Sequence, residues 1–111
     1  MCNTWTSGYP NTIGFQDGFK YTSPISYFDA NSLGIFDMAG NVWEWCYNWH
    51  LPYEGNPQIF STELEGKAQR GGSFLCNPNY CYGFRLSARS ATSPESSLFH
   101  VGFRCVKNIK N

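Results

Sequence analysis

The alternation of hydrophobic and polar residues predicts only short elements in this chain. Residues 42–46 read Val-Trp-Glu-Trp-Cys, which places Trp43 and Trp45 on one face of a strand and Glu44 on the other. The same two-residue period predicts further strands over residues 69–75, 82–88 and 100–107. We therefore expect several short strands, most of them in the second half of the chain.

The remaining segments have the composition of loops. Residues 1–31 contain closely spaced turn signals, among them Gly-Tyr-Pro-Asn and Asp-Gly, which predict a long ordered loop or a set of very short strands. Ser32 is a residue type that opens helices and the Gly-Asn pair at 40–41 ends them, so a short helical turn is expected between the two. Residues 47–66 have loop composition and predict a long connection.

Composition restricts the class of protein. The 111 residues suffice for one small domain, 1–111, and 41% hydrophobic against 14% charged residues indicates globular material. The formal net charge is +0 and no basic run occurs, so we expect no nucleic-acid partner. No apolar stretch reaches membrane length and no signal peptide opens the chain, so no membrane association is expected, and a bacterial source would imply the cytoplasm.

Two cysteines, Cys76 and Cys81, form the most informative constellation. The Asn-Pro-Asn sequence at 77–79 between them is strong turn chemistry, because Pro presets φ and Asn bonds its own backbone. A turn there folds the chain back and brings the two sulfurs to one place. The Gly-Gly pair at 71–72 just before lets another backbone or a ligand come close.

Spacing leaves four interpretations of this thiol pair open. The pair could be a structural disulfide or two unrelated buried cysteines. It could be half of a zinc site, although no second pair of ligands follows downstream. Two thiolates also suit a soft ion such as Cu(I), and a redox dithiol is the fourth alternative.

Oxygen-bearing side chains suggest hard-metal sites elsewhere. Glu44 stands among tryptophans, where a carboxylate needs a partner; with Asp37 and nearby carbonyls it could hold Ca²⁺, or it could pair with an arginine. Asn3 and Asp17 could supply further oxygen ligands or could merely bond turns. The cations near the cysteine loop could bind a peptide or pair with acids such as Glu44; they are Arg85, Arg89 and Arg104.

Several motifs together resemble the sulfatase-modifying-factor family. They are Gly-Ile-Phe-Asp-Met-Ala-Gly-Asn-Val-Trp-Glu-Trp at 34–45, Arg-Gly-Gly-Ser-Phe at 70–74 and Gly-Phe-Arg at 102–104. The Cys-Asn-Pro-Asn-Tyr-Cys-Tyr sequence at 76–82 is similar to that of the family's formylglycine-generating enzymes. The resemblance implies an α+β, loop-rich fold with little regular secondary structure, a variant of the C-type lectin fold, of which this chain matches the C-terminal portion.

The resemblance also implies a reaction and its site. Cys76 and Cys81 would be the catalytic pair that binds Cu(I), with Ser73 lining the site. A cysteine in a sulfatase Cys-x-Pro-x-Arg segment would join as a third thiolate, and O₂ would oxidise it to Cα-formylglycine, which activates the sulfatase. The expected substrate-binding residues are Tyr80, Arg85, Arg89 and His100.

Two structural Ca²⁺ sites are likewise implied by the resemblance. The first would use Asn3, Thr4, Asp17 and Phe19. The second would use Asp37, Gly40, Val42 and Glu44.

The chain also departs from the family pattern. It is less than half the length of the family domain, so the expected partners are a sulfatase polypeptide and the N-terminal half of the domain, and the isolated chain is expected to turn over weakly or not at all. The alternative is a non-catalytic, lectin-like ligand-binding module with Cys76 and Cys81 as a disulfide. An iron-dependent sulfoxide synthase finds no support in the two isolated histidines.

Overall fold

A computed structural model describes residues 1–6, 8, 16–51 and 66–108. The described part contains a small four-stranded sheet with the strand order β3-β2-β1-β4. The strands are β1 (Trp43–Trp49), β2 (Lys67–Arg70), β3 (Ser90–Thr92) and β4 (Val101–Gly102). Most of the predicted connection over 47–66 lies outside the described residues.

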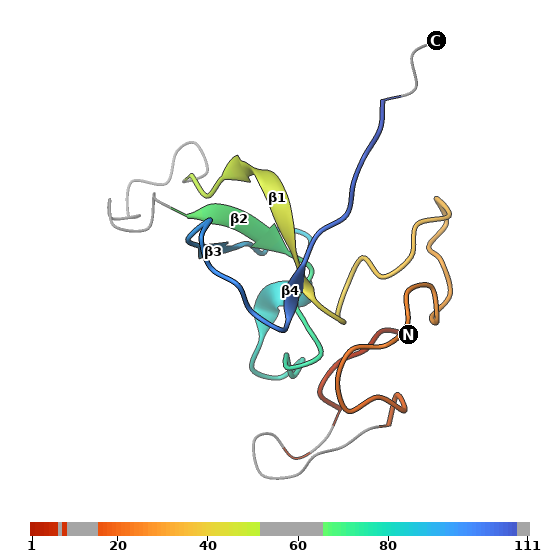
Figure 1. Cartoon of the computed structure of the whole chain (residues 1–111). Coiled ribbons are helices and arrows are strands. Elements are labelled where there is room, and N and C mark those ends of the chain that lie inside the picture. Colours follow the sequence, from red (N-terminus) through yellow and green to blue (C-terminus); the bar gives the residue numbers. More distant parts are fainter. Residues whose placement is uncertain (7, 9–15, 52–65, 109–111) are drawn as a thin grey trace.

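The longest strand, β1, forms the centre of this sheet (Figure 1). It pairs antiparallel with β2, where Trp45 lies opposite Gln69, and parallel with β4, where Trp43 lies opposite Val101. The predicted strand over 42–46 is therefore confirmed, and it continues to Trp49. The two edge strands, β3 and β4, are only three and two residues long, so the sheet is small.

Three of the predicted strands differ from the structure. Strand β2 ends at Arg70, before the predicted end at residue 75, because Gly71 and Gly72 have φ values of +94° and +72° that no strand residue adopts. Residues 82–88 form a single-turn 3₁₀ helix, η2 (Tyr82–Phe84), followed by turns, and not a strand. The predicted strand over 100–107 shortens to β4, after which the chain runs away from the sheet without a strand partner through residue 108 (Figure 1).

The expected helical turn between Ser32 and residues 40–41 is also wrong. The side chain of Asn31 accepts hydrogen bonds from the Leu33 and Ile35 amides at 2.9 and 3.0 Å, and this local capture replaces the helical pattern. A tight turn results, closed by the Gly34 amide on the Asn31 carbonyl at 2.9 Å. The 3₁₀ turn η2 is the only helix in the described part of the chain, so the prediction of a loop-rich chain with little regular secondary structure is confirmed.

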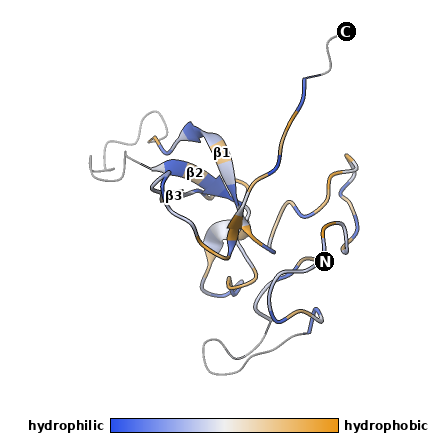
Figure 2. Cartoon of the chain, viewed as in Figure 1, coloured by the Kyte–Doolittle hydropathy of each residue, from blue (hydrophilic) through white to orange (hydrophobic). Residues whose placement is uncertain are grey.

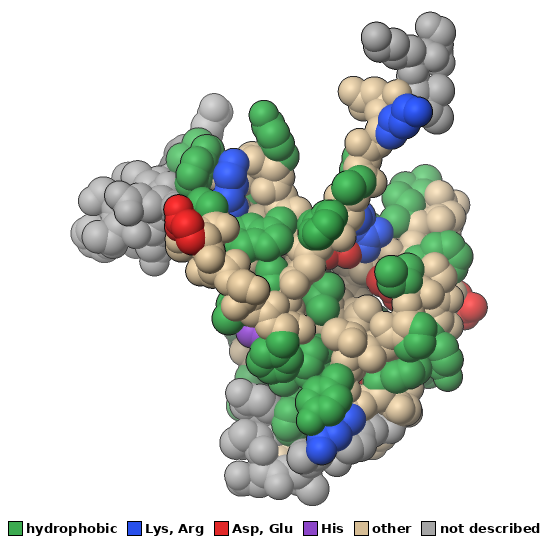
Figure 3. Space-filling view, in the orientation of Figure 1, with side chains coloured by type: hydrophobic (Ala, Val, Ile, Leu, Met, Phe, Trp, Pro, Cys, Tyr) green, Lys and Arg blue, Asp and Glu red, His purple; other side chains and the backbone are tan. Residues whose placement is uncertain are grey.

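The buried interior of the described chain is small and largely polar. Its buried hydrophobic residues are Phe28, Ala68, Phe74 and Cys76. Its buried polar residues are Asn3, Thr4, Asp17, Ser23, Gln69, Ser73 and Asn77. Strands β2 and β3 are mostly hydrophilic, and the hydrophobic stretches lie in β4 and the loops (Figure 2). Hydrophobic side chains are exposed at many places on the visible face (Figure 3), and Ile25 and Phe103 are 86% and 76% exposed.

Within the residues that the structure describes, no helix has the length and apolar character needed to cross a membrane.

Candidate active site

The cysteine loop is closed by the turn that its sequence predicts. The Asn77 side chain accepts the Asn79 amide at 2.9 Å, and the Asn77 carbonyl accepts the Tyr80 and Cys81 amides at 3.0 and 2.8 Å. The chain therefore reverses within five residues and places the sulfurs of Cys76 and Cys81 2.6 Å apart. The hypothesis that an Asn-Pro-Asn turn brings the two thiols together is confirmed.

Cys76 is the inner member of this pair. Its side chain is 7% exposed, and the Ser73 hydroxyl lies 4.0 Å from its sulfur. Burial, followed by the hydrogen bond with Cys81, raises the pKa of the Cys76 thiol to about 11. At neutral pH the buried sulfur is therefore a thiol, and any ligand that needs the thiolate has to displace its proton.

Both members of the pair are free thiols, as are Cys2, Cys46 and Cys105. A reduced dithiol can bind one soft metal ion between its sulfurs, or it can be oxidised to a disulfide. Among the described residues, no group of three or more His, Cys, Asp or Glu side chains could hold a metal ion. The described residues therefore do not supply the further ligands that a four-coordinate zinc site around Cys76 and Cys81 would need.

The expected substrate-binding residues fall into two groups. Tyr80 lies in the cysteine loop and is 70% exposed. Tyr82 directly follows Cys81, and the Arg85 guanidinium stacks over the Tyr82 ring at 4.3 Å from its centroid. These side chains form an exposed aromatic and cationic rim close in sequence to Cys81.

The other two expected residues are held by different contacts. Arg89 donates to the Leu51 carbonyl at 2.7 Å, which ties it to the residue before the undescribed 52–65 segment. His100 accepts the Trp43 amide through its carbonyl at 2.8 Å, and its ring lies edge-on to Phe99, which in turn contacts Phe74. The His100 ring is therefore connected to the site only indirectly, through the rings of Phe99 and Phe74. Its buried Nδ1 has no hydrogen-bond partner in the described structure.

The first expected calcium set is brought together in part. The Asp17 carboxylate accepts the Thr4 amide at 2.9 Å and the Phe19 amide at 3.1 Å, so it contacts two of the other three members through their amides. Asn3 is 1% exposed, and its buried Oδ1 has no hydrogen-bond partner in the described structure. An orphaned buried oxygen on a residue of this set fits a hard cation, because an unpaired buried acceptor is costly.

The second expected calcium set is held differently. The guanidinium of Arg104 donates to both carboxylate oxygens of Glu44, with Nε to Oε2 at 2.6 Å, and to the carbonyls of Phe36 and Asp37 at 3.0 Å. The Asp37 carboxylate accepts the Ser26 amide at 2.9 Å. Arg104 also lines the cavity of about 410 Å³ that these residues share. The arrangement favours the arginine pairing that the sequence left open, and a calcium ion at Glu44 would have to share or displace this contact.

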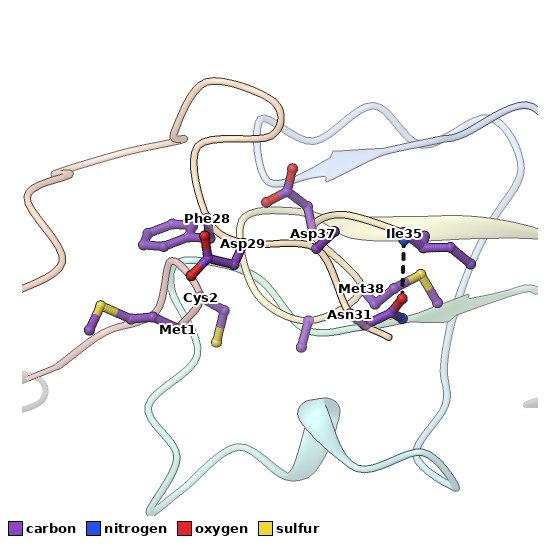
Figure 4. A pocket seen from close by; sticks show the side chains of 10 residues that line it. Met1, Cys2, Phe28, Asp29, Asn31, Ile35, Asp37 and Met38 are labelled. Atoms are coloured by element: carbon purple, nitrogen blue, oxygen red, sulfur yellow. Dashed lines mark hydrogen bonds between the residues drawn. The ribbon is translucent and has the colours of Figure 1, made fainter. Parts of the chain in front are cut away.

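A second cavity of about 410 Å³ is lined by the first two residues and by residues of the 28–39 segment (Figure 4). Cys2, Phe28, Asp29, Asp37 and Met38 are among its lining residues. Burial raises the pKa of the Cys2 thiol there. Neither Cys76 nor Cys81 lines this cavity, so it is separate from the dithiol.

Two hydrogen bonds of the site have no counterpart in the sequence-based predictions. The Trp5 amide donates to the Cys76 carbonyl at 3.1 Å, and Asn77 Nδ2 donates to the Trp5 carbonyl at 3.2 Å. Asn77 was expected to form the turn, but its second contact lies 72 residues away in sequence. No sequence signal could have identified that contact.

The fold and the site together define a loop-rich domain that presents a two-cysteine loop. A family model described as "Sulfatase-modifying factor enzyme 1-like domain" matches residues 1–109. The chain belongs to this family.

Relatives of known name extend this comparison. The chain is 37% identical over 112 residues to the formylglycine-generating enzyme of Streptomyces coelicolor, a match that covers 96% of this chain and 36% of that protein. It is 28% identical over 106 residues to inactive C-alpha-formylglycine-generating enzyme 2 of Bos taurus, covering 93% and 32% of the two chains. The solved structure of Treponema denticola variable protein 1 superposes with a TM-score of 0.57 at 31% identity, over 75% of this chain and 31% of that one.

The chain is much shorter than these relatives. It spans between 29% and 40% of the length of five curated formylglycine-generating enzymes that it matches.

Proposed function

We propose that this chain carries the dithiol site of a formylglycine-generating enzyme. The reaction is the copper-dependent, O₂-using oxidation of a cysteine in a sulfatase Cys-x-Pro-x-Arg segment to Cα-formylglycine. The observation that carries the proposal is the contact between the sulfurs of Cys76 and Cys81 at 2.6 Å on a turn-closed loop whose inner cysteine is buried. Relatives named formylglycine-generating enzyme support the same activity class.

The donor set fits Cu(I). Cys76 and Cys81 supply two soft sulfur ligands, which is the chemistry that selects this ion over hard divalent cations. The described residues provide no third His, Cys, Asp or Glu beside them. A position therefore remains for the thiolate of a substrate cysteine. When bound, Cu(I) supplies the one-electron chemistry that lets O₂ react with a thiol.

The surrounding side chains of the chain hold the pair and face the substrate. Ser73 is 1% exposed beside Cys76, where its hydroxyl can bond a thiolate that replaces the thiol. Tyr80 and the Arg85–Tyr82 stack lie at the exposed rim, where they offer aromatic surface and a cation to a peptide.

The chemical change is confined to the substrate side chain. Its CH₂–SH group loses two hydrogen atoms and becomes a thioaldehyde, while O₂ accepts them and leaves as hydrogen peroxide or, with two further hydrogens from two external thiols that become a disulfide, as two water molecules. Water then replaces the sulfur, which leaves as hydrogen sulfide, and the aldehyde of Cα-formylglycine remains. In a sulfatase this aldehyde is the group on which activity depends.

Calcium belongs to the proposal at the first set only. Asn3 and Asp17 would hold it with the carbonyls of Thr4 and Phe19, since the orphaned Asn3 Oδ1 lies in that set. Its role there would be structural, because oxygen ligands from two distant turns would be tied to one ion. At the second set, Glu44 is already neutralised by Arg104.

The length of the chain bears on its activity. Since it spans between 29% and 40% of its curated relatives, we expect weak or no turnover from the 111 residues alone. The remaining part of the domain would be the partner that completes the enzyme.

An anaerobic Cu(I) competition titration of the reduced chain tests the proposal. We expect one-to-one binding that is lost in Cys76→Ser and in Cys81→Ser. Cys46→Ser is the matched control, because Cys46 is a half-buried free thiol on β1, outside the cysteine loop. Equal loss in all three variants, or no binding by a folded wild-type chain, would refute the copper site.

The non-catalytic binding module predicts a different result. Thiol counting under native and denaturing conditions would then find at least two fewer thiols, because Cys76 and Cys81 would be joined as a disulfide. Five titratable thiols, as the structure has them, would contradict that alternative.

A further inference from the structure

The cysteine loop is fastened to the N-terminal segment by both main-chain groups of one residue. The Trp5 amide donates to the Cys76 carbonyl at 3.1 Å, and the Trp5 carbonyl accepts Asn77 Nδ2 at 3.2 Å. These two bonds fall on consecutive residues at the start of the loop. They fix the direction in which the chain leaves Cys76.

Asn77 joins this anchor to the turn itself. While its Nδ2 bonds Trp5, its Oδ1 accepts the Asn79 amide at 2.9 Å. Asn77 is 7% exposed, and both bonds are partly buried. One buried amide therefore sets the curvature of the loop and its attachment to the rest of the domain.

The anchor has its own support. The Asn3 carbonyl accepts the Asn41 amide at 2.8 Å, and the Asn41 carbonyl accepts the Phe74 amide at 2.9 Å. The segment that carries Trp5 is therefore linked, through Asn41, to the chain two residues before Cys76. Movement of the N-terminal segment would be transmitted to the loop through these bonds.

We propose that Asn77 is a positioning residue, which together with the main chain of Trp5 forms a clamp that holds the thiols of Cys76 and Cys81 together. The clamp holds the two thiols close together both when they bind copper and when an oxidant joins them as a disulfide. Its bearing on copper affinity rests on the proposed function; its bearing on the separation of the thiols does not.

A matched pair of substitutions isolates the clamp. Asn77→Asp keeps an oxygen that accepts the Asn79 amide but replaces the donor to Trp5 with a second acceptor, so it opens the clamp and retains the turn. Asn79→Asp makes the same chemical change two residues further on, at an exposed side chain. Both variants gain one negative charge near the dithiol, so a difference between them reports the loss of the Trp5 contact together with the burial of the charge at residue 77.

The first readout needs no copper. In a glutathione buffer, the two thiols and one oxidised glutathione give one protein disulfide and two reduced glutathione molecules. The equilibrium constant measures how closely the thiols are held. We expect it to fall about tenfold in Asn77→Asp and to stay within about twofold of the wild type in Asn79→Asp. An unchanged or raised constant in Asn77→Asp would overturn the proposal.

The second readout uses the wild-type chain and does not depend on a variant that folds. Because coupling is reciprocal, closing the dithiol should stabilise the clamp and slow hydrogen exchange of the Trp5 amide by about tenfold. The Tyr27 amide, bonded to the Pro24 carbonyl in a separate turn, should keep its rate. A Trp5 amide that is unprotected, or indifferent to the state of the thiols, would refute the clamp.

The two hypotheses fail separately. If the wild-type chain binds no Cu(I) but Asn77→Asp still lowers the disulfide equilibrium constant, the proposed function falls and the clamp stands. If Cu(I) binds equally well to the wild type and to Asn77→Asp, and the disulfide constant is also unchanged, the dithiol copper site stands and the clamp falls.

Discussion

Arg104 and Glu44 are joined across 60 residues by a bidentate ion pair, with Nε to Oε2 at 2.6 Å. The same guanidinium donates to the carbonyls of Phe36 and Asp37, so it links the segment after β4, the central strand β1 and the loop before it. The resemblance to the sulfatase-modifying-factor family assigns Glu44 to a calcium site, whereas in the structure Glu44 binds Arg104.

Arg104→Lys should destabilise the chain, because an ammonium cannot reproduce the fork on Glu44 and both carbonyl contacts. The two side chains are 34% and 22% exposed, so solvent screening limits the expected loss to about 1 kcal/mol. The urea midpoint of unfolding measures it. Arg85→Lys is the control, since Arg85 stacks on Tyr82 at the surface; an equal shift in both variants would contradict the special role of Arg104.

Gly40→Ala should be far more damaging than Gly34→Ala. Both glycines have φ near +75°, so strain in the left-handed region costs each variant about 1 kcal/mol. A Cβ at Gly40 would also lie 2.3 Å from the Asn3 carbonyl oxygen, whereas at Gly34 it would meet nothing within 4 Å. We expect a total loss of about 3 kcal/mol at Gly40, measured by urea unfolding. Equal losses would show that the Asn3 backbone gives way freely.

The reactivity of Cys76 should rise with pH far above neutrality. Burial raises its pKa from 9.0 to about 11, so its alkylation by iodoacetamide in the metal-free chain should keep accelerating beyond pH 9. The sign for stability follows from linkage. The contribution of the buried thiol is fully present below pH 9 and is lost as the pH rises through 11, because the unfolded chain ionises first.

Peptide mapping by mass spectrometry separates Cys76 from the other thiols. The exposed Cys105 serves as the internal reference for reagent access. A Cys76 rate that reaches its plateau by pH 8 would contradict the raised pKa.

Calcium should stabilise the chain through Asp17. Ca²⁺ that binds only the folded state raises the melting temperature with concentration, and Asp17→Asn should abolish that rise because it removes the charged ligand. Asp29→Asn is the matched control, since Asp29 is exposed and lies outside the set. A rise that persists in Asp17→Asn, or that disappears in both variants, would refute calcium at this set; differential scanning fluorimetry measures it.

The sequence is sufficient to predict features that depend on neighbouring residues. The period of Val-Trp-Glu-Trp-Cys predicts β1, and Asn-Pro-Asn predicts the turn that brings Cys76 and Cys81 together, because both depend on neighbouring residues. The same local reasoning was wrong over residues 82–88 and made the strands predicted over 69–75 and 100–107 too long at their C-terminal ends. Strand formation there depends on a partner edge, which the period of a sequence does not report.

Long-range pairing is what only the tertiary structure decided. Glu44 could meet calcium or an arginine, and the parallel pairing of β4 with β1 brings Arg104 onto it. Trp5 and Asn77 meet across 72 residues through a main-chain carbonyl, a group that every residue carries and that leaves no mark in the sequence. The sequence therefore determined which groups can do chemistry, and folding determined which partners hold them in place.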